Sequence, residues 1–273
     1  MFMIAGFVHA MKDRFRQEFY PFAKKYFVDL YLPCMYFSLS QYVLMASIFS
    51  SNNPANFGAI KPGDLYALPF SGFKEYWFLA ALFFVKVIHA FLECKVHKIW
   101  LISAFWLAVF LGVRYVPAPG FLELAAGRLS MGLYFHAGFL LKRYAQRYVL
   151  WQGAALWLAG MACYLGSFAA GAAMLTSLGV FAAFYALKIK PGVLVKCGVL
   201  SMVIYCLHNW ITAVFRMAFK LSGLASSGEP AVLFAVSFCA AMTLPFLVVW
   251  LYKNVKALRW VEYIFYPGRM IKG

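Results

Sequence analysis

Residues 195–220 read VKCGVLSMVIYCLHNWITAVFRMAFK, a stretch that is long and apolar enough to cross a bilayer yet carries a histidine and an arginine. At 100° per residue on a helix, five polar side chains of this stretch fall within about 80° of one another. They are Ser201, Tyr205, His208, Thr212 and Arg216, with Asn209 at the edge of the stripe. Because a charge that faces lipid costs several kcal/mol, the stripe predicts one wall of an internal polar site.

The composition of the chain indicates a membrane protein. It is 64% hydrophobic and only 12% charged over 273 residues, whereas soluble domains are about 45–50% apolar and about 25% charged. We predict an all-α polytopic membrane helix bundle with eight full spans plus an N-terminal partial span. The full spans are expected at residues 27–50, 75–93, 99–113, 121–141, 148–168, 170–187, 197–219 and 230–252. The first ten residues are too short to cross a core of roughly 30 Å and resemble the last part of a span whose beginning is absent.

The distribution of Lys and Arg predicts the topology. The net charge of +16 would suggest a nucleic-acid partner in a soluble protein, but here the cations lie mostly in connections between apolar runs. Alternate connections carry 18 Lys and Arg on one side and 4 on the other. Since cytoplasmic loops are the basic ones, residues 11–26 and the tail 253–273 are predicted to be cytoplasmic. We therefore expect one multi-pass domain, 1–273, in the inner (plasma) membrane, with the lipid bilayer as partner and no nucleic acid.

Two connections and the cysteines allow further predictions. Residues 51–74 are rich in Gly, Pro and Asn and have no helical period, which predicts an outer loop that covers the mouth of the bundle. The basic and aromatic segment 11–26 is either an interfacial helix or a cationic dock for an anionic cytosolic molecule. The six cysteines show no CxxC spacing, and the histidines have no metal-ligand spacing, so neither a disulfide framework nor a metal site is expected.

Several ionisable residues fall inside the predicted spans, where function is the default hypothesis. Lys86, His89 and Glu93 lie within about 60° of one another on a helix, either as a structural Lys–Glu pair or as part of a site. Lys86 and His208 are predicted near the midplane and Arg128 and Arg216 at an outer level. His136 falls in the inner third of its span. Together these residues predict a polar, cation-lined passage for an anionic or hydroxyl-rich ligand.

Four stretches together resemble one protein family. They are FMIAGFVHA (2–10) with the following basic YPFAKKYFVDLYLPCMYFS (20–38), EYWFLAALFF (75–84), LSMGLYFHAGFLLKR (129–143) and VLSMVIYCLHNWI (199–211). Their order and spacing resemble the acyltransferase 3 family of integral-membrane enzymes that O-acylate sugars of surface polysaccharides. The last stretch resembles that family's late G-x-x-S-x-x-I/L-Y-x-x-H span. The likeness covers roughly residues 3–250.

The resemblance implies a ten-helix bundle in which cytoplasmic acyl-CoA supplies an acyl group to a sugar hydroxyl at or beyond the membrane. It assigns His208 a supporting role in catalysis, Trp77 a place at the start of a span, and Lys24 and Lys25 to the basic linker that would contact acyl-CoA. There are two departures. The family's first span, with an Arg and the His thought to be catalytic eleven residues later, is absent, and Asp29 stands where an Arg would precede Pro33.

Three hypotheses follow. The first is an envelope O-acyltransferase that lacks its first helix and is either active or an inactive remnant. It moves an acyl group, which we take to be acetyl, from the co-substrate acyl-CoA to a glycan acceptor, with no bound cofactor. In it His208 supports proton transfer, and the substrate is bound by Arg128, Arg216, Lys86, Tyr205, Asn209 and Trp77. The alternative is a transporter or flippase for an anionic or lipid-linked sugar that uses the same cations. The third is a non-catalytic partner in an envelope-biosynthesis complex.

Overall fold

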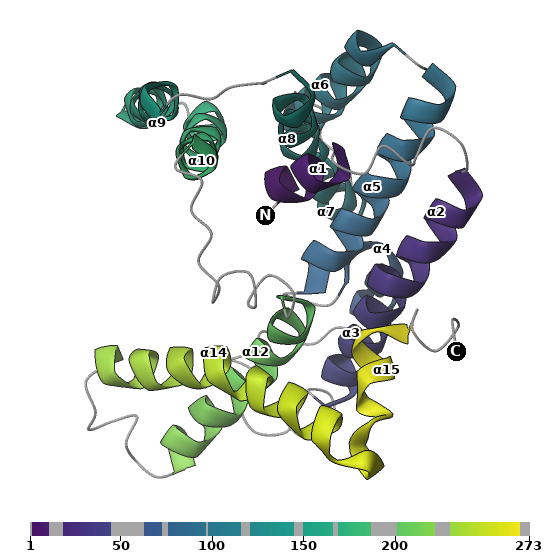
Figure 1. Cartoon of the computed structure of the whole chain (residues 1–273), viewed down its shortest axis with the longest axis vertical. Helices are drawn as coiled ribbons and strands as arrows, with labels where there is room; N and C mark the ends of the chain where they lie inside the picture. Colours follow the sequence, from purple (N-terminus) through teal and green to yellow (C-terminus); the bar gives the residue numbers. More distant parts are fainter. Residues whose placement is uncertain are drawn as a thin grey trace. The chain divides into compact units, whose positions relative to one another are not determined.

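The structure is a computed structural model in which every described regular element is a helix (Figure 1). It describes residues 2–10, 19–44, 63–72, 76–96, 98–115, 121–144, 150–165, 169–186, 201–221 and 230–267. The chain forms two compact units, which are described in turn. The first contains residues 1–26, 69–71 and 77–190, and the second contains residues 27–68, 72–76 and 191–273.

Helix α5 (Trp77–Val96) is central to the first unit. It packs against α2 (Phe19–Tyr26), α6 (Ile99–Tyr115), α7 (Phe121–Leu129) and α8 (Gly132–Tyr144). Its buried side chains include Leu79, Leu82, Val85 and His89. This spacing of three and four residues places one face of α5 against its neighbours, so α5 can present its polar residues to the interior of the unit.

Helix α1 (Phe2–Ala10) lies close against α8 because both contribute a glycine at the crossing. A Cβ atom on Gly6 would collide with the backbone carbonyl of Phe135, and one on Gly138 would collide with the backbone of Met3. Small residues permit this approach of two helix backbones, as they do in membrane proteins generally. The crossing fixes the position of α1 and therefore of His9 near its end.

The predicted span 121–141 is two helices, α7 and α8, joined by a turn at Ser130–Met131. The Ser130 hydroxyl donates to the Gly127 carbonyl at 2.6 Å, which is a local bond that competes with continued helix. Gly132 follows at once, and its missing side chain makes room for the ring of Trp106. The apolar run therefore located helical structure here but did not predict the break within it.

Helices α9 (Leu150–Leu165) and α10 (Ala169–Ala186) pack closely on each other. Glycines again lie at the contact. A Cβ on Gly153 or Gly179 would be within 3 Å of the backbone of the other helix, and one on Gly160 would meet Thr176. Close packing of this kind stabilises helix pairs without requiring a water-driven hydrophobic effect.

In the second unit, the π-helical turn η2 (Phe27–Tyr31) leads into α3 (Leu32–Leu44). Pro33 has no backbone N–H and its ring would clash with the carbonyl four residues earlier in a regular α-helix. Pro33 is fully buried, and the wider π turn just before it relieves this clash. Cys34 and Phe37 on α3 are buried, and the Phe37 ring stacks on that of Phe265 with centroids 5.4 Å apart.

Helices α12 (Ser201–Leu221) and α14 (Pro230–Asn254) pack on each other in the same unit. The part of the tail that the structure describes continues with η5 (Lys256–Leu258) and α15 (Val261–Phe265), which packs against both. Tyr76, which is fully buried, donates its hydroxyl to the Cys206 carbonyl at 2.8 Å. This bond ties the chain segment before α5 to the helix that carries His208.

The outer loop predicted at 51–74 contains a helix, α4 (Gly63–Ser71). Leu68 is buried there, so burial stabilises a helix that the local sequence pattern does not predict. It ends at Gly72, whose φ of 62° is the left-handed conformation that closes many helices, and whose N–H donates to the Leu68 carbonyl at 2.9 Å. Residues 51–62 of this loop, and 11–18 of the basic linker, lie outside the described residues.

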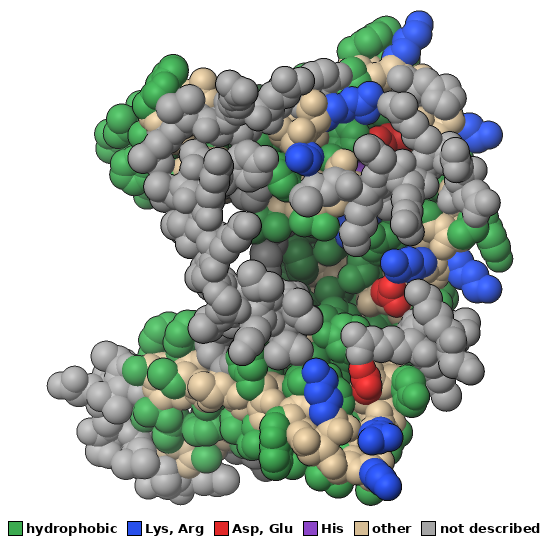
Figure 2. Space-filling model, in the orientation of Figure 1, with side chains coloured by type: hydrophobic (Ala, Val, Ile, Leu, Met, Phe, Trp, Pro, Cys, Tyr) green, Lys and Arg blue, Asp and Glu red, His purple; other side chains and the backbone are tan. Residues whose placement is uncertain are grey.

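The helices expose large apolar side chains, which suits a lipid surrounding. Figure 2 shows hydrophobic side chains over much of the surface of α14. Phe234, Phe238 and Trp250 on that helix are 71%, 54% and 58% exposed. Two described helices, Trp77–Val96 and Leu233–Asn254, have the length and hydropathy of a membrane span. Apolar surface of this extent is rare on soluble monomers, so it supports a membrane location.

The predicted all-α class is confirmed. Each of the eight predicted apolar runs contains described helix, and no described residue lies in a β-strand. The number of spans, and the organisation as one domain, stay predictions.

Candidate functional site

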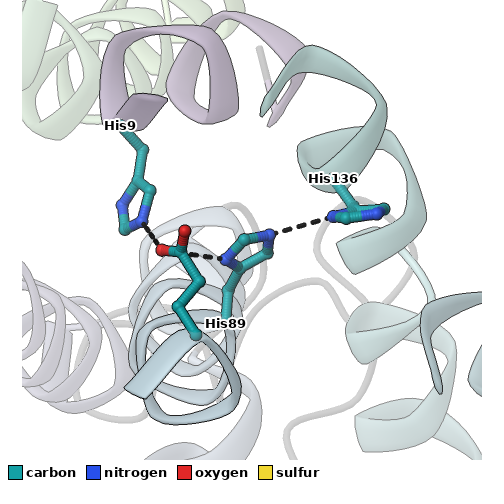
Figure 3. Close-up of polar contacts among 4 residues, drawn as sticks. His9, His89 and His136 are labelled. Carbon is teal, nitrogen blue, oxygen red and sulfur yellow. Dashed lines mark hydrogen bonds and ion pairs between the residues drawn. The ribbon is translucent and has the colours of Figure 1, made fainter. Parts of the chain in front are cut away.

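A carboxylate and three histidines form a chain of polar contacts in the first unit (Figure 3). We call His9, His89, Glu93 and His136 the histidine–glutamate cluster. Glu93 Oε2 lies 3.0 Å from His9 Nε2 and 3.6 Å from His89 Nδ1. On the other side of the same imidazole, His89 Nε2 lies 3.0 Å from His136 Nδ1. The series of polar contacts therefore runs without a break from α1, through Glu93 and His89, to α8.

The cluster is almost closed to solvent. The three histidines are at most 2% exposed, and the Glu93 side chain is 16% exposed. Aromatic rings surround it: the His89 ring centroid lies 4.8 Å from that of Phe139, 5.2 Å from that of Phe135 and 6.4 Å from that of Trp106. Polar groups in such a low-dielectric setting interact strongly and need partners. Glu93 is the most exposed of the four side chains.

Four helices supply the parts of this arrangement. His89 and Glu93 are one helical turn apart on α5, so their side chains share a face. His9 comes from α1, which the Gly6–Gly138 crossing holds in place, and His136 comes from α8. Ser103 on α6 extends this series of polar contacts, because its Oγ lies 2.8 Å from His136 Nε2. Imidazole and carboxylate groups in contact can move protons or bind a cation.

Lys86 lies on α5, the helix that carries His89 and Glu93 of the cluster. Its Nζ lies 4.3 Å from the centroid of the Tyr26 ring, in a cation–π contact. The ion pairs of Glu93 are with His9 and His89. His89 and Glu93, two of the three residues predicted to share a face, are thus in contact, and the role of Lys86 stays a prediction.

Two predicted substrate residues meet at the other end of α5. The Arg128 guanidinium lies 5.6 Å from the centroid of the Trp77 ring, and the Phe2 ring stacks near the same indole with centroids 6.4 Å apart. Trp77 begins α5 and Glu93 is near its end, about 24 Å away at 1.5 Å per residue. The cation–aromatic pair and the histidine–glutamate cluster are therefore separate features of one helix.

His208 belongs to the second unit, on α12. Its Nδ1 donates to the Tyr205 carbonyl at 2.6 Å, one turn earlier on the same helix. The Tyr205 and His208 rings lie side by side with centroids 5.5 Å apart. The side chain is half-buried. The predicted passage that joins His208 to Lys86 and Arg128, which belong to the first unit, stays a prediction.

The remaining predicted site residues are on two helices. Lys24 and Lys25 are exposed on α2, whose buried Phe22 faces the His9 ring with centroids 5.7 Å apart. The helix is thus amphipathic, and the two predicted roles of the basic segment, interfacial helix and cationic dock, stay predictions. Asn209 and Arg216 lie on α12, and their side chains fall outside the described ones.

Sequence reasoning missed how His9 and His136 contribute. Residues 2–10 were interpreted as the end of a span and as part of the family resemblance, and His136 was placed by its depth, but neither histidine was given a contact. The signal was present, because a histidine inside an apolar run needs a polar partner and the chain has three such residues near basic connections. Which helices adjoin, however, depends on tertiary packing that the spacing does not contain.

The comparisons with known proteins identify the family. The family model described as an acyltransferase domain matches residues 1–250, which is most of the chain and includes both units. No curated protein and no solved structure matches the chain. Together with the helical fold and the two helices of membrane-spanning length, this match shows that the chain belongs to the acyltransferase 3 family of membrane-embedded acyltransferases.

Proposed function

We propose that the chain transfers an acyl group, which we take to be acetyl, from cytoplasmic acyl-CoA to a sugar hydroxyl of a cell-surface glycan. Membership of the acyltransferase family supports the reaction class. The donor, the acceptor and the location in the inner membrane with a cytoplasmic C-terminus are parts of the proposal. Neither the described residues nor the comparisons favour the transporter alternative.

The observation that carries the proposal is the orientation of His208. Its Nδ1–H donates to the Tyr205 carbonyl, so in the neutral imidazole the lone pair is on Nε2. A backbone carbonyl that fixes the tautomer makes Nε2 available to accept a proton from a hydroxyl group. In the proposed reaction the acceptor hydroxyl attacks the thioester carbonyl, the carbon–sulfur bond breaks, and the proton taken by His208 is returned to the CoA thiolate.

In this proposal, basic side chains of the first unit bind the phosphates of CoA. Lys24 and Lys25 are exposed on α2, and α8 ends with Lys142 and Arg143 in the same unit. Phosphate groups are bound well by lysine and arginine through charge-assisted hydrogen bonds. The charge distribution predicts that these ends face the cytoplasm, where acyl-CoA is available.

The Trp77–Arg128 pair is our candidate for contact with the sugar acceptor. An aromatic face and a guanidinium together offer an apolar surface and several hydrogen-bond donors, which suits a hydroxyl-rich ring. This end of α5 is predicted to be the outer one. Lys86, Tyr205, Asn209 and Arg216 remain proposed substrate contacts.

The test is an acyl-transfer assay with the purified chain in lipid nanodiscs. We expect release of the CoA thiol from acetyl-CoA to increase when a glycan acceptor is added, with acetate recovered on the sugar. Folded protein that neither binds nor consumes acyl-CoA would contradict the proposal. In proteoliposomes, movement of the sugar without consumption of acyl-CoA would instead support the transporter hypothesis.

A further inference from the structure

The histidine–glutamate cluster brings three metal-ligand atoms into one place. His9, His89 and Glu93 each offer one ligand atom, and these three atoms lie within 4.8 Å of one another; Glu93 Oε2 is 3.0 Å from His9 Nε2 and 3.6 Å from His89 Nδ1. We propose that these three atoms form a site for a divalent transition-metal ion, with zinc as the best fit. The sequence alone predicted no metal site, because His9 is 84 residues from Glu93 along the chain.

Two of the three separations between the ligand atoms are close to those around a small tetrahedral ion, and all three are at most 4.8 Å. Zinc binds imidazole nitrogen and carboxylate oxygen at about 2.0–2.2 Å, so neighbouring tetrahedral ligand atoms are separated by roughly 3.3–3.6 Å. The observed separations from Glu93 Oε2 are 3.0 Å to His9 and 3.6 Å to His89. Two imidazoles and one carboxylate leave a fourth position for water or another ligand. Glu93 is the partly exposed member, so that position can open on its side.

The hydrogen bonds beyond His89 favour a cation at its Nδ1. The Ser103 hydroxyl donates to the Ile99 carbonyl at 3.1 Å, so its oxygen accepts from His136 Nε2–H. His136 Nδ1 then accepts from His89 Nε2–H. With the protons donated in this direction, all three hydrogen bonds form. His89 Nδ1 then keeps a lone pair, which faces a carboxylate oxygen. Two acceptors facing each other in a buried site require a positive partner between them.

If the hydrogen bonds were donated in the opposite direction, fewer buried polar atoms would have a partner. If Ser103 donated to His136, the proton on His89 would be on Nδ1. That atom is buried and makes no hydrogen bond to any described residue, since Glu93 Oε2 is 3.6 Å away, beyond a good N–H···O distance. A metal ion resolves this position, because it binds the lone pair directly and takes the place of the proton between His9 and Glu93.

The surroundings are those of a supported metal ligand. A ligating histidine almost always donates its second N–H to an outer partner that fixes the ring, and His136 supplies this acceptor for His89. Trp106, Phe135 and Phe139 form an apolar shell around the ring. Since His9 is on α1 and the other two ligands are on α5, a bound ion would cross-link these helices.

The test measures metal, not acyl transfer, so it is independent of the proposed function. Tag-free full-length protein in detergent is stripped with a chelator, dialysed against Zn²⁺, and assayed for zinc by elemental analysis. We expect about one zinc per chain, and with Co²⁺ as probe the visible absorption of a tetrahedral site. Zinc should also raise the thermal unfolding temperature of the stripped protein.

The variants separate this site from other metal binding. His89→Gln and Glu93→Gln should reduce zinc to background, while His136→Gln, which removes only the outer partner, should weaken affinity by about 10- to 100-fold. His208→Gln, in the second unit, should bind zinc as wild type does. The proposal is overturned if wild-type protein binds no zinc, or if folded Glu93→Gln retains it. Absence of zinc from the wild-type protein overturns the proposal by itself. The test therefore remains conclusive even if a variant fails to fold.

Discussion

The central histidines of the two units, His208 and His89, differ in burial and in the origin of their partners. His208 in the second unit is oriented by the carbonyl of Tyr205, a residue of the same helix turn, and is half-buried. His89 in the first unit is fully buried, and besides Glu93 on its own helix it meets His136 from α8 and the ring of His9 from α1. The first arrangement exists as soon as α12 forms, whereas the second exists only when several helices have packed.

This difference separates a local orientation from a tertiary one. Replacing His208 leaves one backbone carbonyl that water or its helix partner can satisfy, so stability should change little. Replacing a member of the histidine–glutamate cluster leaves buried polar groups without partners, which is the costly case in a low-dielectric interior. Activity and stability measurements on matched variants can therefore test the comparison.

The largest effect is expected from His208→Gln on acyl transfer. Loss of a general base typically lowers the rate by about 10²- to 10⁴-fold. The unfolding temperature should stay at the wild-type value, because the lost hydrogen bond is local. Val214→Ala is the control, since Val214 is on the same helix and 55% exposed. A His208→Gln protein with wild-type kcat would remove His208 from the proposed mechanism.

Next is Gly138→Leu at the crossing of α1 and α8. The new side chain would collide with the Met3 backbone, so α1 must move and carry His9 away from Glu93. Overpacking costs about 1–3 kcal/mol, and a clash with backbone should reach the upper end of that range. The measurement is the thermal unfolding of purified protein in detergent.

The control for this substitution is Gly112→Leu on α6, where a Cβ meets nothing within 4 Å. Its unfolding temperature should match that of the wild type. Equal behaviour of the two leucine variants would show that the close crossing is not a determinant of stability.

Helix faces could be predicted from the sequence, whereas helix neighbours could not. The 100° spacing correctly placed His89 and Glu93 on one side of a helix, and the structure puts them in contact. It also placed Tyr205 and His208 together. The contacts of His9 with Glu93 and of His136 with His89 join residues 84 and 47 positions apart, and no periodicity connects them.

Apolar runs located the helices but not their irregularities. The turn at Ser130–Met131 depends on a serine that bonds to the helix backbone and on a glycine that admits Trp106. The π turn before Pro33 reflects a clash that develops only once the helix continues through the proline. A hydropathy window averages over such residues, because each of them is compatible with an apolar segment.

A smaller change in stability is expected from Glu93→Gln, measured in the presence of a chelator. The carboxylate is hydrogen-bonded to His9 and lies in ion-pair range of His89, and a hydrogen bond to a charged group contributes about 1.5–3 kcal/mol. The unfolding temperature should therefore fall. Glu123→Gln, at an exposed position on α7, should leave it unchanged. If both variants behave alike, the cluster is not the tertiary feature that distinguishes the first unit.

The smallest effect should come from Tyr76→Phe in the second unit. The substitution removes only the hydroxyl that donates to the Cys206 carbonyl at 2.8 Å, so about 1 kcal/mol of stability should be lost. Cys206 is two residues before His208 on α12, and a small shift of that helix should lower acyl transfer less than His208→Gln does. Tyr66→Phe, at an 81% exposed position, is the matched control. A rate loss as large as that of His208→Gln would mean that His208 is oriented by tertiary contacts after all, and the contrast between the two units would no longer hold.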